Sequence, residues 1–416
     1  MLSTVYGREG GVVRITDVEV IRVKAPVWDP PEGWTTSPLD ALFDEAEGHR
    51  RFPMGVYNGL PGTRTDPVFT VIVRVTTEGG QTGLGGIALG SSAVADIVEH
   101  HLRPFVIGSS VFDTELIWER LYRSTVNIGR KGLVVEAISG VDIAIWDALG
   151  KVLGQPVYNL LGGRTRSRIR AYCSAGHTTA SPDRMAERAR ERMDRYGLTG
   201  FKMWFGYGPR DGRPGMRRNV DCVRALREAL GEDIDLMGDA YMGWNVTYAI
   251  EMIRMLEPFH LTWIEEPLLP DDVAGYGRIR SAVGTPIAAG EHEFTRWGFR
   301  ELIDHGAVDI LQPDVNRMGG ITEARKVWAL AQAHGLEVVP HSHNFHNLHL
   351  VMSHLNSPLA EFFPTDYVDG DTFFSTLFRG EAAVVDGHIT LSGAPGFGVS
   401  LDEDVVGRHA VVPSRS

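Results

Sequence analysis

Three carboxylates stand at equal intervals in the second half of the chain, and each comes shortly after an apolar run. Asp239, Glu265 and Glu291 are separated by two intervals of 26 residues, and the runs before them read Ile-Asp-Leu-Met, Leu-Thr-Trp-Ile and Pro-Ile-Ala-Ala. That rhythm is typical of consecutive strands joined by returning helices, which places the strand ends at one edge of a parallel sheet. Three hard oxygen ligands converging there suit Mg²⁺. We therefore expect these carboxylates to bind the metal at the mouth of a parallel α/β fold.

The alternation of strand and helix runs from residue 169 to residue 341. Apolar residues recur at helical spacing, and each helical segment leads to a strand-like run that ends in polar residues. Seven or so units of about 25 residues predict a TIM-type barrel, although periodicity alone leaves a doubly wound open sheet as an alternative. The expected helices cover residues 184–196, 219–230, 248–259, 273–283, 295–306 and 322–334.

An α+β unit precedes the barrel. Its expected strands cover residues 12–27, 67–77 and 80–89, the last two joined by a hairpin turn at residues 78–80. Its expected helices cover residues 91–106, 113–126 and 132–153. The segment 28–66 is long and rich in Pro, Gly and charge, which favours a functional lid over a linker.

We expect three parts in the chain. Residues 1–155 form the α+β N-terminal capping domain, residues 156–365 the catalytic barrel, and residues 366–416 a segment that packs back on the cap. Paired glycines in residues 156–163 mark the first boundary. Within the last part, residues 377–391 have a strand-like composition.

Composition restricts the partners. The formal net charge of −12, from 53 acidic against 41 basic residues, disfavours nucleic acid and anionic membranes, which require a basic face. The two cysteines are too few for a disulfide framework, and no apolar run reaches the length of a membrane span or resembles a signal peptide. We expect a cytoplasmic protein with a small-molecule partner.

The carboxylate spacing continues downstream. Asp314 and His341 lie 27 residues apart on successive strands of the pattern, and Glu361 follows 20 residues later. With the three earlier carboxylates, this layout resembles the enolase superfamily and, within it, the mandelate racemase subgroup. The resemblance implies a modified (β/α)7β barrel under a capping domain and a homo-oligomer.

The same resemblance implies roles for single residues. Asp239, Glu265 and Glu291 would bind Mg²⁺, and Glu266 is left out because it is displaced by one position. Asp314 and His341 would form a catalytic dyad, and Glu361 would take the place of the family's electrophilic glutamate.

Four further motifs resemble the rhamnonate dehydratases, a branch of sugar-acid dehydratases in this subgroup. The resemblance implies elimination of water from a sugar acid. It is carried by Gly-Phe-Lys-Met at residues 200–203, Gly-Glu-His-Glu at 290–293, Gln-Pro-Asp at 312–314 and Pro-Gly-Phe-Gly-Val at 395–399.

The chemistry can be argued from the residues as well. Removing a proton next to a carboxylate creates a dianionic enediolate, which a metal on one side and Lys202 on the other would stabilise. His341, held by Asp314, suits the base, and its imidazolium could then protonate the departing β-hydroxyl. The resemblance also implies that racemases of the subgroup carry a Lys-x-Lys motif on this strand, with the second Lys as a base. Here the corresponding residues are Lys202, Met203 and Trp204. Because Trp204 cannot take a proton, one-base dehydration is favoured over two-base racemisation.

Substrate contacts are expected from His292, Trp204, Arg50 and Arg51, the arginines lying in the segment 28–66. L-Rhamnonate is the reference substrate, and L-lyxonate, L-mannonate, D-arabinonate or an aldaric acid stay open. A racemase or epimerase on the same scaffold, or a catalytically idle binding protein, is the rival reading.

Structural roles compete with each functional assignment. The three carboxylates could be helix N-caps, Lys202 a solvated residue and Glu361 a loop acid. The histidines from His341 onward could form a transition-metal site, although His343, His346 and His349 are expected to be pocket wall or structural. Asp142, Asp147 and Lys151 are expected to be structural charges.

Overall fold

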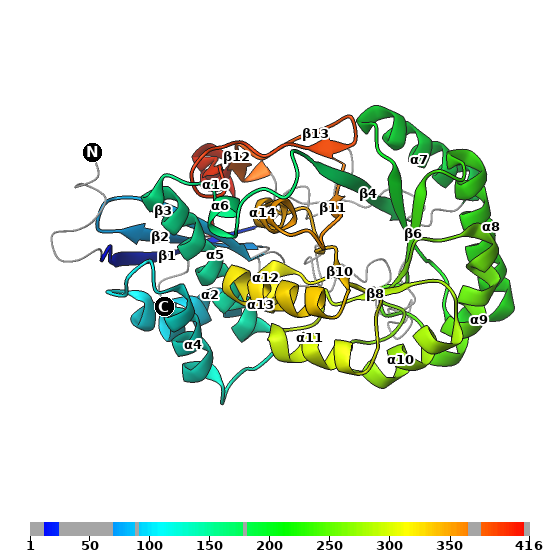
Figure 1. Ribbon diagram of the computed structural model, residues 1–416, viewed down its shortest axis with the longest axis horizontal. Coiled ribbons are helices and arrows are strands. Elements are labelled where there is room, and N and C mark those ends of the chain that lie inside the picture. The colour runs from blue at the N-terminus through cyan, green and yellow to red at the C-terminus, as the bar shows by residue number, and fades with distance from the viewer. Residues whose placement is uncertain (1–11, 25–69, 88–90, 178–180, 365–375, 412–416) are drawn as a thin grey trace.

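The structure, a computed structural model, describes residues 12–24, 70–87, 91–177, 181–364 and 376–411. A smaller unit holds an antiparallel sheet, and in a larger unit helices surround parallel strands (Figure 1). Within the described residues, no helix combines the length and the apolar character needed to cross a bilayer. The expected lid at residues 28–66 lies outside them.

The smaller unit contains a three-stranded antiparallel sheet in the order β1-β2-β3. β1 spans Ile15–Val23, β2 spans Thr70–Thr77 and β3 spans Thr82–Ile87. Gly80, with φ +79°, donates its N–H to the Thr77 carbonyl between β2 and β3. The predicted hairpin is therefore confirmed.

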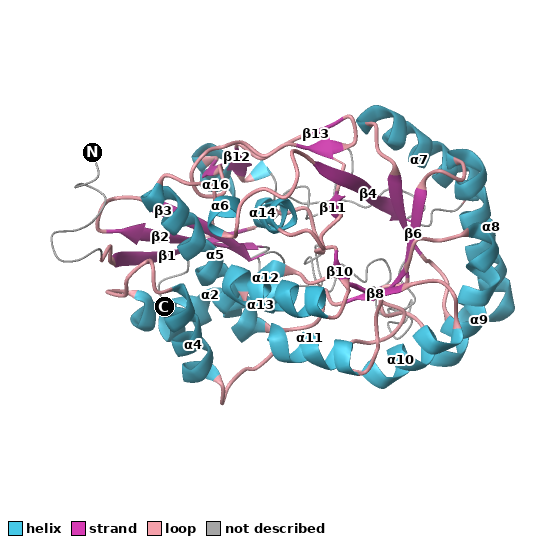
Figure 2. Cartoon of the chain, in the orientation of Figure 1, coloured by secondary structure: helices cyan, strands magenta, loops and turns pink. Residues whose placement is uncertain are grey.

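Helices cover one face of this sheet (Figure 2). The longest helix, over residues 133–153, was predicted almost to its ends, whereas the predicted helix 91–106 is divided by a π-helical segment. The longest helix is buried over most of its length because it lies between the sheet and helices of the larger unit (Figure 1). The helices are α2 (Ser92–Asp96), η3 (Ile97–Leu102), α3 (Arg103–Val106), α4 (Thr114–Thr125) and α5 (Leu133–Leu153).

The approach of α5 to β3 requires glycine. A β-carbon at Gly83 would lie 2.0 Å from the Ala144 carbonyl oxygen, whereas one at Gly393 in the tail would meet nothing within 4 Å. We expect Gly83→Ala to lower the free energy of unfolding by about 3 kcal/mol, because the helix must move away from the strand. Urea unfolding measures this loss. The Gly393→Ala control should stay within about 1 kcal/mol of wild type, and equal effects of the two changes would contradict the packing argument.

In the described part of the chain, the larger unit is built on eight parallel strands. β11 pairs with β4, and the sheet continues in the order β4-β5-β6-β7-β8-β9-β10. Near the other end, the Val338 N–H in β10 donates to the Asn356 carbonyl, just before β11. This arrangement confirms the predicted (β/α)7β barrel. The strands are β4 (Ile169–His177), β5 (Gly200–Trp204), β6 (Asp235–Asp239), β7 (Ile264–Glu265), β8 (Ile287–Ala289), β9 (Ile310–Leu311), β10 (Glu337–Val338) and β11 (Leu359–Phe362).

Helices ring these strands on the outside (Figure 1). All six predicted helices are present: five have ends shifted by up to three residues, whereas α8 begins at Gly212, seven residues before its predicted start. The helices α6, α12 and α14 were not predicted. The helices of the larger unit are α7 (Pro182–Tyr196), α8 (Gly212–Leu230), α9 (Val246–Leu256), α10 (Val273–Ala282), α11 (Thr295–Asp304), α12 (Val315–Met318), α13 (Gly320–Ala333) and α14 (Phe345–Ser353). The short helix α6 (Val157–Leu160) precedes them and packs against α5 and α14.

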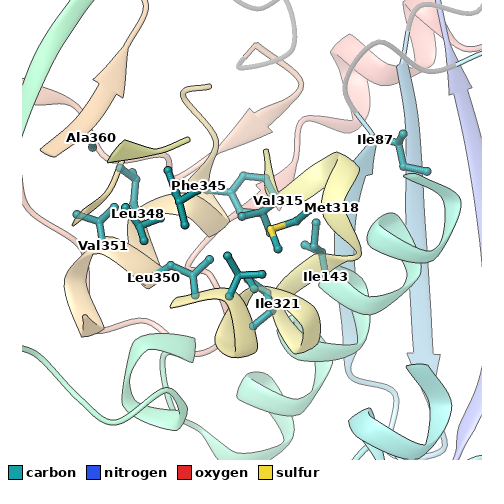
Figure 3. Close-up of a cluster of buried hydrophobic side chains, with 14 of the residues drawn as sticks. Ile87, Ile143, Val315, Met318, Ile321, Phe345, Leu348, Leu350, Val351 and Ala360 are labelled. Carbon is teal, nitrogen blue, oxygen red and sulfur yellow. The ribbon is translucent and has the colours of Figure 1, made fainter. Parts of the chain in front are cut away.

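Apolar residues form two buried clusters. In the small cluster, the Tyr172 and Trp263 rings meet edge to face with centroids 5.6 Å apart. Its members lie in or next to barrel strands and are Tyr172, Met237, Trp263, Ala288, Ile310, Val339 and Leu359. The larger cluster lies between strands, helices and cap, and Figure 3 shows part of it between α14 and α12–α13. The helix α14, which follows the loop after β10, is thereby held in the core.

The tail contacts both units. The Asp147 carboxylate in α5 accepts the Phe397 N–H at 2.8 Å, while β14 pairs antiparallel with β4 of the barrel. Residues 377–391 do not form one continuous strand, because Asp386 (φ +47°) and Gly387 turn the chain between β13 and β14. The predicted boundaries at residues 155 and 365 stay predictions. The tail elements are β12 (Phe378–Arg379), β13 (Val384–Val385), β14 (His388–Ile389), β15 (Ser400–Leu401) and α16 (Glu403–His409).

Candidate active site

The three evenly spaced carboxylates meet at the end of the barrel strands. Asp239 and Glu265 are the last residues of β6 and β7 and face each other in register, and Glu291 follows β8 by two residues. One oxygen of each lies within 4.8 Å of the other two, and all three side chains are buried. The following helices α9 and α10 are capped by Asn245 and Asp272, so the N-cap alternative is wrong for Asp239 and Glu265.

Neighbouring donors orient these carboxylates. The Tyr241 N–H donates to Asp239 Oδ1 at 2.8 Å, and Gln312 Nε2 donates to Glu265 Oε2 at 2.7 Å. Burial first, and then mutual repulsion, raise the pKa of Asp239 well above its ordinary value. An oxygen-rich, buried and mutually repelling set of this kind fits a divalent cation, which would relieve the repulsion.

Lys202 links this cluster to Glu361. Its Nζ lies 2.5 Å from Glu265 Oε1, 3.5 Å from Asp239 Oδ2 and 2.9 Å from Glu361 Oε1. Burial opposes the charge of Lys202, but the surrounding carboxylates outweigh it and raise the lysine pKa well above its ordinary value. The reading of Lys202 as a solvated strand-end residue is wrong, because its side chain is buried.

Asp314 and His341 form a hydrogen-bonded pair beside the cluster. Asp314 Oδ2 lies 2.9 Å from His341 Nδ1, and His341 Nε2 lies 3.6 Å from Glu291 Oε1. Burial lowers the pKa of His341, but Glu291 and Asp314 outweigh it and raise the value to about 10. A cation bound to Glu291 would offset part of that carboxylate charge and bring the imidazole closer to neutrality. The pair has the geometry of a base with a fixed tautomer.

Glu361 is an ionised acceptor in this arrangement. It lies in β11, where Oε2 accepts the Ser342 N–H at 2.6 Å while Oε1 pairs with Lys202. Burial raises its pKa, but Lys202 and His341 outweigh burial and bring the pKa of Glu361 to about 2. The loop-acid reading is wrong, since Glu361 is buried between the lysine and the residue after His341.

The expected substrate-contacting residues divide into two groups. Trp204 ends β5 and stacks on Tyr241 with centroids 6.2 Å apart, and His292 meets the same Tyr241 ring edge on at 5.8 Å. The aromatic rings thus form one wall beside the carboxylates. Arg50 and Arg51 lie outside the described residues.

Two neighbours escaped the sequence reasoning. Glu266, which was left out of the metal site, is buried and lies 2.8 Å from His292 Nδ1 through Oε2, on a backbone with φ +38°. Arg317 is buried, donates to the Glu291 carbonyl at 3.1 Å and lies 3.6 Å from Asp314 Oδ2. Two features of the sequence could have indicated these residues: the adjacent acids Glu265-Glu266, and the spacing of three residues between Asp314 and Arg317, which suits a local ion pair.

The later histidines do not join the carboxylate cluster. The His343 ring packs on Phe362 at 5.1 Å, and His346 lies against Phe345 and Phe397. His349 accepts the Tyr158 N–H at 3.1 Å, a contact between barrel helix and α6. These contacts agree with the structural role, and a role in the pocket wall stays a prediction. Asp142 and Asp147 are likewise structural, bonded to Thr322 and to Lys151 and Leu84.

The buried histidines predict acid sensitivity. Burial lowers the pKa of His346 to about 3. Below pH 6.5, the His346 imidazole is therefore protonated in the unfolded chain but stays neutral in the folded chain, which favours unfolding. Between pH 7 and pH 5, the free energy of unfolding of wild type should therefore fall by about 1–2 kcal/mol more than that of His346→Leu. Urea unfolding at the two pH values measures this difference. His349→Leu should instead be less stable already at pH 7, because the Tyr158 N–H loses its acceptor. An unchanged pH slope in His346→Leu would refute this assignment.

Two family models match the chain. Residues 184–405 match the enolase C-terminal domain-like family, and residues 61–162 match the mandelate racemase / muconate lactonizing enzyme N-terminal domain. The chain belongs to the mandelate racemase subgroup of the enolase superfamily. The carboxylate cluster and the Asp314–His341 pair both lie in the part of this chain that the C-terminal family matches.

Individual members of the superfamily resemble this chain over most of its length. An L-rhamnonate dehydratase from Saccharopolyspora erythraea is 42% identical over 370 residues, covering 86% of this chain and 91% of that protein. The crystal structure of L-rhamnonate dehydratase from Gibberella zeae has a TM-score of 0.82 at 30% identity and covers 97% of both chains. The same enzyme complexed with Mg, and a magnesium-bound racemase from Streptomyces coelicolor (31% identity, TM-score 0.79, 95% of this chain and 100% of that one), are also similar.

Proposed function

We propose that this enolase-superfamily member dehydrates an aldonic acid of the L-rhamnonate class to a 2-keto-3-deoxy sugar acid, with Mg²⁺ as cofactor. The observation that carries the proposal is the imidazole of His341, which is paired with Asp314 and lies beside the buried carboxylate cluster. The similarity to L-rhamnonate dehydratases over most of the chain supports this reaction, and the Mg-complexed relative supports the metal.

The metal would be held by Asp239, Glu265 and Glu291. When bound, it would supply positive charge to the carboxylate of the substrate and so lower the barrier to removal of the α-proton. Gln312 and Tyr241 keep two of the ligand carboxylates in fixed orientations through hydrogen bonds. Two of the three proposed ligands are therefore held in place by neighbouring residues.

His341 takes the proton. Its Nδ1 is bonded to Asp314, which leaves Nε2 as the basic atom on the side of Glu291. The α C–H bond breaks as Nε2 gains the proton, and negative charge spreads onto the substrate carboxylate. Lys202, held ionised among carboxylates, supplies positive charge on the opposite side.

The same imidazole completes the elimination. The protonated His341 donates its proton to the β-hydroxyl, the C–O bond breaks, and water leaves as the carbon–carbon double bond forms. The resulting enol then tautomerises to the 2-keto acid, so atoms balance without an added reagent. One residue acting first as base and then as acid implies syn elimination.

Trp204 argues against the isomerase alternative. A racemase requires a second base on the opposite face of the α-carbon, and the indole of Trp204, which stacks on Tyr241, has no basic nitrogen. We propose that Trp204 and His292 contact the substrate instead. Arg50 and Arg51 stay candidates for the same role.

A substrate panel tests the proposal. The enzyme with Mg²⁺ is incubated with L-rhamnonate, L-lyxonate, L-mannonate, D-arabinonate and aldaric acids, and 2-keto acid formation is measured. The expected result is keto-acid product from at least one aldonate. The same incubation in D₂O separates the rivals, because an inverted, deuterated acid without keto product would establish an isomerase, and no change with any acid would support a binding protein.

A further inference from the structure

The main chain behind His341 makes a strained turn. Ser342 has φ +77°, a left-handed conformation that residues with a β-carbon disfavour. Such conformations persist where surrounding groups over-determine them, and they concentrate at functional sites. The contacts that hold Ser342 therefore also decide where the preceding histidine points.

Three buried side chains hold this turn. Asn347 Nδ2 donates to the His341 carbonyl at 2.7 Å and to the Ser342 carbonyl at 3.0 Å. Glu361 Oε2 accepts the Ser342 N–H at 2.6 Å, and Asn344 Nδ2 donates to Ser342 Oγ at 2.8 Å. Asn347 thus bonds both peptide carbonyls that flank the Ser342 nitrogen and α-carbon.

Asn347 is itself attached to the core. It lies in the first turn of α14, whose Phe345, Leu348 and Val351 belong to the apolar cluster that includes Val315 and Met318 of α12 (Figure 3). Because close-packed interiors resist displacement, α14 offers a fixed support for the amide. The core position of the helix is thereby transmitted to the loop that carries His341.

The rest of His341 is bonded at two further points. Its N–H donates to the Pro313 carbonyl at 3.1 Å, and its Nδ1 lies 2.9 Å from Asp314 Oδ2. Pro313 and Asp314 both belong to the loop after β9, so these bonds fix the histidine to one neighbouring loop. Asn347 supplies the bond from the opposite side, at the carbonyl.

We propose that Asn347 is a positioning residue for the dehydration, which holds the His341–Ser342 backbone so that the imidazole faces the substrate side of the site. The inference rests on the proposed function. Asn347 Nδ2 donates to the backbone carbonyls of His341 and Ser342, so the proposed role is exerted through His341.

Asn347→Asp tests the role with little change in shape. A carboxylate in place of the amide removes the donor and sets negative charge against two carbonyl oxygens. With Mg²⁺ and L-rhamnonate, we expect kcat to fall about 10- to 100-fold while KM stays within about 3-fold, because misplacing a catalytic group by about 1 Å has effects of this size.

Asn356→Asp is the matched control. Asn356 Nδ2 also donates to two backbone carbonyls, those of Trp328 and Leu336, both at 3.3 Å, but it bonds neither His341 nor Ser342. Its variant should lose thermal stability while kcat stays within about 3-fold of wild type. An equal fall of kcat in both variants would show a general structural role and overturn the proposal.

A second readout does not require activity. In the full-length protein, the His341 Nδ1 proton bonded to Asp314 gives a low-field NMR signal, assigned by its loss in His341→Asn. Asn347→Asp should shift or broaden this signal and Asn356→Asp should leave it unchanged. If wild type converts no aldonate, the proposed function fails while the NMR comparison still decides the role of Asn347.

The unchanged case overturns the inference. Wild-type kcat together with an unaltered low-field signal in Asn347→Asp would mean that the Asn347 amide does not position His341. If the aspartate variant does not fold, Asn347→Ser, which keeps a shorter hydrogen-bond donor, is measured in the same two ways and should show the same losses in smaller degree.

Discussion

His341→Asn is expected to reduce kcat for the proposed dehydration by at least about 10³-fold, because the change removes the imidazole that we propose as the base. Asn is close to His in size and can still bond Asp314, so the fold and the metal ligands should be kept. Turnover is measured as 2-keto acid formation, and Mg²⁺ binding is measured as the rise in thermal midpoint on adding the metal.

A nearby histidine serves as the control for that variant. His354 is the C-cap residue directly after α14, where its Nδ1 lies 3.0 Å from the Leu350 carbonyl, and in the described structure its side chain has no recorded contact with the carboxylate cluster. His354→Asn should keep kcat within a few-fold of wild type. Normal turnover in His341→Asn would refute the mechanism, and loss of the Mg²⁺ response would place His341 in metal binding instead.

Lys202→Met is expected to destabilise the metal-free protein by about 3–5 kcal/mol, because it leaves buried carboxylates without their cation. Lys202 is the shared partner of Glu265, Glu361 and Asp239, and all four side chains are buried. Mg²⁺ should restore more stability in this variant than in wild type, since metal and lysine neutralise the same charges. Activity should stay lost even with metal bound. Urea unfolding with EDTA and with Mg²⁺ measures these effects.

Lys151→Met supplies the comparison for Lys202→Met. Lys151 Nζ lies 2.6 Å from the buried Asp147 Oδ2 in α5, an ion pair in the cap. Its loss should also lower stability, but equally with and without Mg²⁺. A Lys202→Met protein that is as stable as wild type without metal, or that gains no more from Mg²⁺ than Lys151→Met, would contradict the shared-charge explanation.

Much of the fold could be predicted from the sequence, because strand and helix periods and carboxylate spacing are local signals. The long helix α5, the hairpin of β2 and β3, and the strand ends at Asp239 and Glu265 all follow from residues that are neighbours in the chain. The barrel itself followed from the regular repeat of these units.

The errors have local causes too. The helix at residues 345–353 was missed because it is short and follows a histidine-rich stretch that reads as a loop. Residues 377–391 were read as strand-like, but turns at Gly380 and at Asp386-Gly387, all with positive φ, divide them into two-residue strands. Glu266 was set aside by spacing, whereas its positive φ turns it toward His292.

By itself, the sequence determined which chemical groups stand at the strand ends, since the periods of strand and helix bring Asp239, Glu265, Glu291, Asp314 and His341 to one edge. Tertiary structure decided how these groups share their charges. Lys202 joins Glu265 to Glu361, Arg317 lies between Glu291 and Asp314, and Asn347 holds the turn after His341. Such contacts depend on barrel register and on single backbone angles, and neither leaves a periodic trace along the chain.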